Sequence, residues 1–491
     1  MSTGADRLAG AALGFREPPP AGFLTRLSSY PWLVVGTTCI AAFIGQVDAS
    51  IVQLALPALE QAFGAKLHVV AWTAVGYSLA FACILPVFAR LAEIAGRKLM
   101  YLIGFALFGL ASALCGLAPS LPWLIAFRVL QGMSGAMLGA NSIVILVAAA
   151  GPARKARAMG IFAAAQAIGV SAGPALGGVL LDAFDWRWVF WVSVPFSLAA
   201  AVIGWLVVPV TANTKADRGF DGRGALLLMP ALTLLLLAVT EVRVWGATSP
   251  ATLGCIAASV ALLFAFVRRE RRVPSPLLDV LLFRSAAFSG GCVAIVLSYA
   301  MLYGMFFAMS FALVRGYHDT PLAAGLRLAL VPIGLGIVAP FSSGLSEKHP
   351  RLVPLVGMAI CAATAIALTF VMRRSPDSMV PVMIALAAYG AGLGLFIAPN
   401  NSTTLSAAPP ERAGQAGGLL NLLRVFGTGL GVAAASSLLA WRIRLSTGVD
   451  GHTLGVPELA LLAAIADVML MLAAFAVIAA GATLLHARRP A

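Results

Sequence analysis

The sequence predicts an all-α protein that crosses a membrane many times. Of its 491 residues, 60% are hydrophobic and only 11% are charged, whereas a soluble domain carries about 25% charged residues. Apolar stretches of about 20 residues, long enough to cross a bilayer as a helix, recur along the whole chain. We therefore interpret the chain as a polytopic membrane protein rather than a soluble one.

We expect fourteen transmembrane helices, one for each long apolar stretch. Gly and Pro inside several stretches are compatible with this interpretation, because membrane helices tolerate both. The expected helices cover about residues 32–58, 69–91, 98–118, 122–148, 156–181, 187–209, 223–241, 250–267, 286–313, 321–343, 352–371, 380–400, 414–440 and 459–485.

The distribution of Lys and Arg predicts the orientation. With the N-terminus inside, the inner segments hold roughly 22 of these residues and the outer loops roughly 8, and an excess of positive charge marks the cytoplasmic side. Both termini are therefore expected in the cytoplasm, and the net charge of +14 is interpreted as a topology signal rather than a nucleic-acid surface. The Arg- and Ala-rich composition favours a bacterial cytoplasmic (inner) membrane.

The first expected helix contains one charged residue, Asp48. No other charge lies between Arg26 and Glu60, and Asp48 is roughly 24 Å along its helix, inside the hydrocarbon core. A carboxylate at this depth is costly and usually marks a proton, ion or substrate path. The alternative is a carboxylate paired with a neighbouring helix for packing alone.

The loop after the second helix carries a carboxylate and two basic residues around a tight turn. Its sequence over 89–98 is Ala-Arg-Leu-Ala-Glu-Ile-Ala-Gly-Arg-Lys. A carboxylate at a helix end and basic residues across a turn can form a charged latch between helices at the cytoplasmic face. The motif residues of this loop are Leu91, Glu93, Gly96, Arg97 and Lys98. A basic loop that serves topology alone is the alternative.

The fourth helix places an arginine among small residues. Arg128, Gln131 and Gly132 begin a face that continues with glycines at helical spacing. Because an arginine inside a membrane needs an acceptor or a water-filled cavity, we consider a link from Arg128 to Asp48 through water. Extension of the Arg128 side chain outward to the interface is the alternative.

The fifth helix carries a stripe of glycines around a proline, at Gly169, Gly173, Pro174, Gly177 and Gly178. Such a stripe lets helix backbones approach closely, and the proline removes one helical hydrogen bond.

Two polar stretches, 211–223 and 268–284, separate one helical pair from the other helices. We therefore predict a cytoplasmic tail over 1–31, a six-helix bundle over 32–210, polar loops with two inserted helices over 211–285, and a second six-helix bundle with a short tail over 286–491. Segment 344–351 is weakly similar to the latch segment 89–98 and occupies the corresponding place in the second half, and such repeats are typical of transporters.

These motifs resemble those of the major facilitator superfamily, specifically its fourteen-helix drug:proton antiporters, over about residues 32–486. Segment 46–57 is similar to that family's first-helix signature, with Asp48 in the place of its membrane carboxylate. Segment 89–98 resembles the superfamily's loop motif but departs from it at Ala89, Glu93 and Ile94. Residues 169–178 match the antiporter motif Gly-x-x-x-Gly-Pro-x-x-Gly-Gly, which in the family separates exporters from importers.

The resemblance implies a major facilitator fold of two six-helix bundles plus two inserted helices. It also implies proton-coupled efflux, by alternating access, of amphipathic drugs or toxic compounds, cations included, with Asp48 and Arg128 in the coupling. The alternatives are an exporter dedicated to one metabolite, such as an antibiotic, siderophore or acidic compound, and a non-transporting membrane sensor on the same fold.

The second half contributes candidate cavity residues. Tyr299, Tyr303 and Phe306 form a stripe on the ninth helix, and Asn421 and Arg424 share one face of the thirteenth. Aromatic rings can bind lipophilic cations through their faces, and packing or lipid contact is the alternative. Arg424 either lines a cavity or caps a carbonyl. Asp467 in the last helix ranks below Asp48 as a proton carrier.

Other chemistry is not indicated. The six cysteines lie in apolar runs without a CxxC pair, which argues against disulfides and zinc, and no nucleophile–base pair or phosphate loop suggests an enzyme. We expect no metal and no cofactor. The expected partners of a monomer are a proton, a small-molecule substrate and the lipid bilayer, with no nucleic acid; a periplasmic adaptor protein is an open alternative.

The orientation can be tested with reporter fusions. Because positive residues mark the cytoplasmic side, fusions at Arg269 and Arg488 should report cytoplasm, and one near Gly451 should report the exterior. An external signal at Arg488 would contradict the predicted topology.

Overall fold

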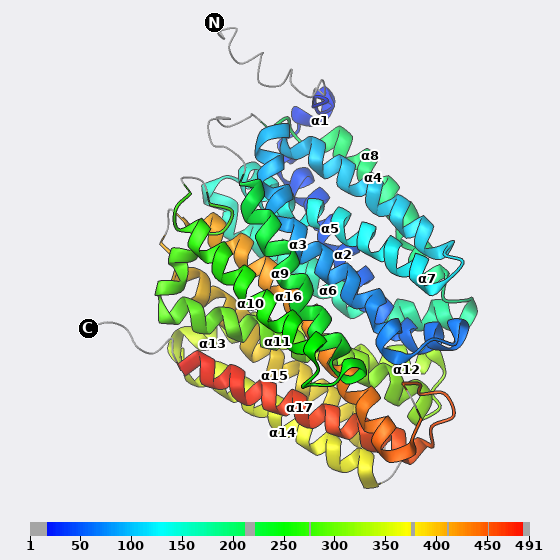
Figure 1. The fold of residues 1–491 in the computed structure, drawn as a ribbon. Coiled ribbons are helices and arrows are strands. Elements are labelled where there is room, and N and C mark those ends of the chain that lie inside the picture. The colour runs from blue at the N-terminus through cyan, green and yellow to red at the C-terminus, as the bar shows by residue number, and fades with distance from the viewer. Residues whose placement is uncertain are drawn as a thin grey trace, which may run out of the picture.

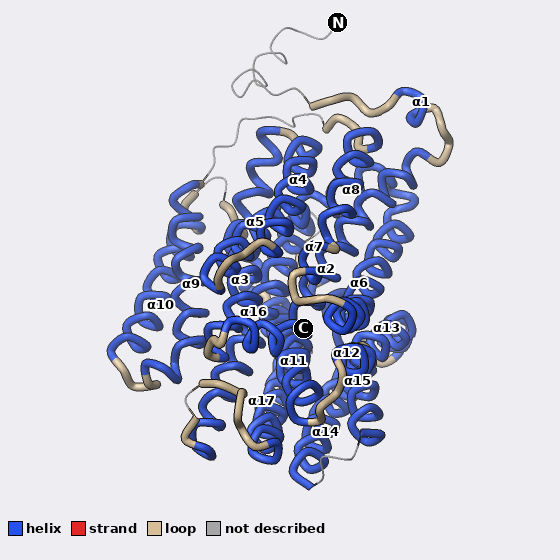
Figure 2. The backbone as a smooth tube through the Cα atoms, turned by 90° about the vertical axis from the view of Figure 1, so that its right-hand side faces the viewer, coloured by secondary structure: helices blue, strands red, loops and turns tan. Residues whose placement is uncertain are grey.

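The computed structural model describes residues 17–211, 221–273, 276–374, 379–409, 412–449 and 451–484. Within these residues it contains helices and no strands (Figures 1 and 2). Fourteen helices of the described chain are long and apolar enough to cross a membrane. This confirms the predicted fold class, an all-α polytopic membrane protein with fourteen transmembrane helices. The fusion site Arg488 lies outside the described residues.

Six spanning helices make up the N-terminal half. After a short helix α1 (Gly22–Thr25), they are α2 (Tyr30–Phe63), α3 (Leu67–Ala95), α4 (Arg97–Gly116), α5 (Leu121–Ala150), α6 (Lys155–Ala183, preceded by the 3-10 turn Pro152–Arg154) and the pair α7 (Trp188–Trp191) with α8 (Ser193–Val207). Within this half α2 packs on α6, α5 and α8, and α3 and α4 pack on α5.

The C-terminal half follows an inserted pair, α9 (Gly222–Trp245) and α10 (Pro250–Glu270). Its helices are α11 (Ala286–Phe311, extended by the π-helical turn Ala312–Gly316), α12 (Pro321–Leu328) with α13 (Leu330–Lys348), α14 (Leu352–Arg374), α15 (Met379–Ser406), α16 (Ala413–Thr447) and α17 (Glu458–Leu484); the 3-10 turn Val280–Arg284 precedes α11. Here α11 packs on α16 and α17, and α14 packs on α15 and α17.

Two expected helices are interrupted shortly before a proline. The helix expected over 321–343 breaks at Ala329, three residues before Pro332, and the helix expected over 187–209 breaks three residues before Pro195. Proline has no N–H for the carbonyl four residues earlier, so the helical hydrogen-bond ladder is open at both places. Each interrupted helix continues as one span.

The inserted pair lies against both halves. Helix α9 packs on α10, on α3 of the N-terminal half and on α16 of the C-terminal half. Asp221 accepts a hydrogen bond from the Gly224 backbone N–H at the start of α9, and Arg269 at the end of α10 pairs with it at 2.6 Å. Trp72 Nε1 of α3 donates to Glu241 Oε1 of α9 at 3.0 Å. The contacts of Asp221 therefore hold α9 and α10 to each other, and the Trp72–Glu241 hydrogen bond fastens the pair to α3.

We call the side on which α2 begins the terminal side, and the side on which α2 ends the opposite side. On the opposite side the two halves are joined by polar contacts. The fully buried Glu60 at the end of α2 accepts hydrogen bonds from the backbone N–H and the hydroxyl of Thr453, in the loop before α17. The Leu67 backbone N–H donates to the Gly451 carbonyl at 2.6 Å.

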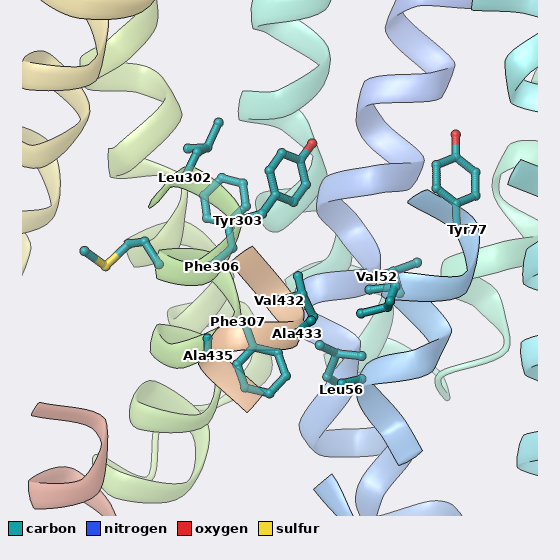
Figure 3. Close-up of a cluster of buried hydrophobic side chains, with 14 of the residues drawn as sticks. Val52, Leu56, Tyr77, Leu302, Tyr303, Phe306, Phe307, Val432, Ala433 and Ala435 are labelled. Atoms are coloured by element: carbon teal, nitrogen blue, oxygen red, sulfur yellow. The ribbon is translucent and has the colours of Figure 1, made fainter. Parts of the chain in front are cut away.

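Apolar packing seals the halves together between these contacts and the middle of the molecule. The apolar plug, as we call it, consists of Val52 and Leu56 of α2, Phe307 of α11, and Val432 and Ala433 of α16, all essentially inaccessible to solvent (Figure 3). Burial of such side chains is worth about 1.5–3 kcal/mol each for the larger ones. On the opposite side, the space between the two halves is thus closed.

Candidate functional site

The residue that stands out in the sequence, Asp48, forms a direct ion pair with Arg128. Arg128 Nη1 of α5 lies 2.7 Å from Asp48 Oδ2 of α2, and the exposed fractions of the two side chains are 1% and 0%. A bridge of water between them, and extension of Arg128 to the interface, were the two expected arrangements, and the structure shows neither. The guanidinium instead reaches inward and contacts the carboxylate itself.

Neighbouring groups complete this polar network. Gln131 Nε2 donates to Asp48 Oδ1 and to Ser112 Oγ, both at 2.8 Å, and Arg128 Nε donates to the Thr73 carbonyl at 2.9 Å. Both oxygens of Asp48 therefore accept hydrogen bonds from N–H donors, which is the arrangement of an ionised carboxylate. A buried charge is tolerated when it is paired and hydrogen-bonded in this way.

A cavity lies beside the network, between the two halves. It is lined by Ala41, Ala42, Gly45, Gln46, Ala49, Tyr77, Phe81, Phe108, Gly135, Leu138, Gly139, Ser142, Ile143, Phe162, Gln166, Tyr299, Tyr303, Asn421, Arg424, Val425 and Thr428. Apart from Ala49, the residues of α2, α6 and α16 among them belong to the part of each helix nearer the terminal side. With the apolar plug beyond it, the cavity lies in the middle and the terminal half of the molecule.

Four of the five residues expected to line a cavity do so. Tyr299 and Tyr303 of α11 and Asn421 and Arg424 of α16 are in its wall. Phe306 is not; it is fully buried one turn further along α11, in the apolar cluster with the plug (Figure 3). Asp48 does not line the cavity either.

Tyr77 contacts both the ion pair and the cavity. Tyr77 is part of the cavity wall, and the Arg128 guanidinium carbon lies 4.3 Å from the centre of the Tyr77 ring, within the range of a cation–π contact. Gly132 and Gly135 of α5 make room for it, because a Cβ at Gly132 would collide with the Tyr77 carbonyl and one at Gly135 would lie 2.9 Å from its hydroxyl. Sequence reasoning missed Tyr77, since an aromatic residue in an apolar helix gives no distinct signal.

Gln46 and Gln166 were also missed, although a signal existed. Both line the cavity, and both are amides within long apolar helices, where polar side chains are rare and usually face the bundle interior.

The glycine stripe of α6 faces two different neighbours. A Cβ on Gly169 would lie 2.7 Å from the Phe43 carbonyl oxygen, and one on Gly177 would lie 2.9 Å from Ile51 Cγ1, so this face packs on α2 within the N-terminal half. Gly178 instead meets the C-terminal half, where an added Cβ would lie 2.7 Å from the Pro321 carbonyl oxygen. The carbonyl of Pro174 lies against Gly325 of α12, which the sequence did not single out. The motif thus forms part of the boundary between the halves.

The loop motif is tied together on the terminal side within the N-terminal half. Glu93 pairs with Arg90 and with Arg97, the latter at 3.4 Å, while Leu91 is half-buried beside them. Lys98 Nζ donates to the Trp205 carbonyl of α8 at 2.8 Å. The Glu93–Arg97 pair therefore joins the end of α3 to the start of α4.

The tail also contacts this loop. Glu17 accepts hydrogen bonds from the Leu99 and Thr211 backbone N–H groups, at 3.2 and 2.7 Å. Gly96 has a φ of 101°, and a Cβ there would collide with the Glu17 carboxylate. Glycine is required at this turn for both reasons.

Asp467, ranked below Asp48 as a proton carrier on sequence alone, lies far along the sequence from the Asp48–Arg128 network. It has cationic partners of its own. Arg373 of α14 and Arg442 of α16 both pair with it.

Comparison with known proteins identifies relatives over most of the chain. The family model described as Major Facilitator Superfamily matches residues 38–432. The chain is 34% identical over 425 residues to the multidrug resistance protein Stp of Mycobacterium tuberculosis, covering 86% of this chain and 78% of that protein. It is 31% identical over 433 residues to the tetracenomycin C resistance and export protein of Streptomyces glaucescens, covering 88% and 79%.

Among solved structures, a bacterial homolog of the human lysosomal transporter Spinster, in an inward-facing and unoccupied conformation, has the same fold. The TM-score is 0.68 at 17% sequence identity, and the match covers 95% of this chain and 100% of that one.

The contact between α6 and α2 makes a prediction about stability. In Gly173→Val the new side chain would collide with Ser50 Oγ and lie 3.0 Å from the Ile51 backbone nitrogen, and overpacking of this kind costs about 1–3 kcal/mol. We expect a lower unfolding temperature of the purified protein. Gly160→Val on the same helix is the control, because nothing lies within 4 Å of a Cβ there. Equal unfolding temperatures of the two variants would contradict the close packing at Gly173.

Proposed function

The chain belongs to the major facilitator superfamily, and on that premise we propose that it exports amphipathic compounds from a bacterial cell in exchange for protons. The observation that carries this proposal is the buried network of Asp48, Arg128 and Gln131 beside a cavity that both halves line. An ionised carboxylate within the membrane, next to a cavity, is the arrangement expected of a proton-coupled site.

The direction of transport is supported by two observations. The antiporter motif of α6 packs on α2 through Gly173 and Gly177, and it meets α12 across the boundary that must move through Gly178. The names of the two relatives refer to multidrug resistance and to export. We therefore propose efflux rather than uptake.

Alternating access accounts for the asymmetry of the molecule. On the predicted orientation, with both termini in the cytoplasm, the terminal side is the inner side, and we propose an inward-facing state that Glu60–Thr453 and the apolar plug close on the outer side. The cavity measures about 80 Å³, and pockets for drug-sized ligands are roughly 300–1,000 Å³. It must widen on the inner side to admit a substrate.

The proton step follows from the hydrogen bonds of Asp48. In the inward-facing state the carboxylate is ionised and holds Arg128 and Gln131. When the outer side opens, a proton from outside neutralises Asp48 and removes its attraction for Arg128, whose guanidinium keeps the Thr73 carbonyl and the Tyr77 ring as partners. Return to the inward-facing state and loss of the proton to the cytoplasm restore the ion pair. One proton thus enters per cycle.

An exporter dedicated to one metabolite is the second candidate. The narrow cavity favours it, and one relative is named for a single compound, tetracenomycin C. Growth inhibition by a panel of dyes, biocides and antibiotics, with and without expression in an efflux-deficient host, separates the two: protection against many unrelated compounds indicates multidrug efflux, and protection against one indicates a dedicated exporter. The non-transporting sensor lacks such support, because the buried Asp48–Arg128 pair expected of a proton-coupled transporter is intact.

The role of Asp48 can be tested directly. Asp48→Asn keeps the size of the side chain and an acceptor for Arg128 but cannot exchange a proton, so substrate-induced proton release from inverted vesicles should be abolished while the protein still reaches the membrane. Asp48→Glu should retain part of it.

Asp467→Asn is the matched control, because it removes another carboxylate from the spanning helices, one that is paired with two arginines. Proton release should persist in this variant. Full coupling in Asp48→Asn would place the proton on another group.

A further inference from the structure

Within the part of the chain that the structure describes, the cavity wall contains a single charged side chain, that of Arg424. Its other polar residues are neutral: the amides of Gln46, Gln166 and Asn421, and hydroxyl groups of serine, threonine and tyrosine. Among the described residues, no carboxylate lines it. The charge that a ligand meets inside the cavity is therefore positive.

Arg424 differs from the two other arginines that the sequence places inside spans. Arg128 is paired with Asp48, and Arg327 is paired with Asp319. Arg424 donates through Nη2 to Asn421 Oδ1 at 2.8 Å and lies 5.8 Å from the centre of the Tyr299 ring, and no carboxylate of the described residues pairs with it. A guanidinium has five N–H donors in a planar fork, so most of its capacity is available toward the cavity.

The membrane carboxylate of the network, Asp48, does not compensate the charge of Arg424. Asp48 is already matched by Arg128, accepts bonds at both oxygens, and does not line the cavity. A cationic ligand would meet Arg424 in a medium of low dielectric, where repulsion is strong. An anionic ligand would instead gain a charge-assisted, bidentate contact with the guanidinium.

The rest of the wall suits a flat, aromatic body. Six aromatic rings from both halves line the cavity, those of Tyr77, Phe81, Phe108, Phe162, Tyr299 and Tyr303. Aromatic side chains favour offset-stacked and edge-to-face contacts with other rings. Tyr299 and Tyr303 stand on α11, across the boundary from Tyr77 and Phe81 on α3.

We infer that the substrates are acidic aromatic compounds whose anionic group binds Arg424, with Asn421 holding the guanidinium in place. This inference rests on the proposed export function and replaces the cationic substrates that the family resemblance suggested. It also changes the energetics. Exchange of a monoanion for one proton moves two charges in the direction that an inside-negative potential favours, whereas exchange of a monocation for one proton moves none.

Two dyes with the same xanthene body and opposite charge test the inference: fluorescein, which carries a carboxylate and a phenolate, and rhodamine 123, a cation. Binding to the purified full-length protein in nanodiscs is measured by fluorescence anisotropy. The variants are Arg424→Gln, Arg424→Lys, and Arg442→Gln as the control, which removes a positive charge from the same helix at a residue that does not line the cavity.

We expect the unsubstituted protein to bind fluorescein more tightly than rhodamine 123. Arg424→Gln should weaken fluorescein binding about tenfold or more, as expected for loss of a charge-assisted hydrogen bond, without weakening rhodamine 123 binding. Arg424→Lys should retain part of the affinity, and Arg442→Gln should retain all of it.

Tighter binding of rhodamine 123, failure to bind fluorescein, or fluorescein binding unchanged in Arg424→Gln would overturn the inference. None of these results would contradict the proposed function, which is tested separately by the growth panel and by the proton-release assay on Asp48→Asn. A second arm uses proteoliposomes: an imposed potassium diffusion potential should accelerate fluorescein transport, and indifference to that potential would contradict anion–proton exchange.

Discussion

The ion pair between Asp48 and Arg128 is the interaction around which the N-terminal half is organised. Neither charge is tolerable alone in the middle of a membrane, and together they draw in partners from four helices: Asp48 on α2, Thr73 on α3, Ser112 on α4, and Arg128 with Gln131 on α5. Removal of one partner leaves a buried, unpaired charge, which is far more costly than the pair is stabilising. Protonation of the carboxylate likewise leaves Arg128 without its counter-charge, and it needs only one proton. A small chemical event can therefore bias a large rearrangement.

The packing shows which contacts the rearrangement must break and which it must keep. The Glu60–Thr453 hydrogen bonds, the apolar plug and the contact of Gly178 with α12 join the two halves on the opposite side. The glycine contacts between α6 and α2 and the latch around Glu93 hold the N-terminal half together internally. Since closely packed interfaces switch between discrete arrangements rather than deforming smoothly, the halves are expected to rock as bodies. The inserted pair, fastened to α3 and α16 at once, must follow that motion.

The sequence predicted the helices better than it predicted the contacts between them. Asp48, Arg128 and Gly173 stand out because a charge or a glycine stripe in an apolar helix has few explanations. The direct Asp48–Arg128 contact could not be predicted, because depth along each helix does not give the relative height of two helices. Glu60 and Thr453 are nearly 400 residues apart, and only the fold brings them together. Phe306 shares a stripe with Tyr303, yet one turn separates the cavity wall from the packed plug.

The claim that Asp48 is the group that exchanges the proton is tested most directly by infrared difference spectroscopy of the purified protein. Spectra recorded on acidification report buried carboxylates that become carboxylic acids. We predict a carboxylic-acid band that is absent in Asp48→Asn, persists in Asp467→Asn, and changes in frequency when Gln131, the donor to Asp48 Oδ1, is replaced by Leu. A difference spectrum of Asp48→Asn identical to that of the unsubstituted protein would contradict the claim, because the proton would then reside on a group outside the network.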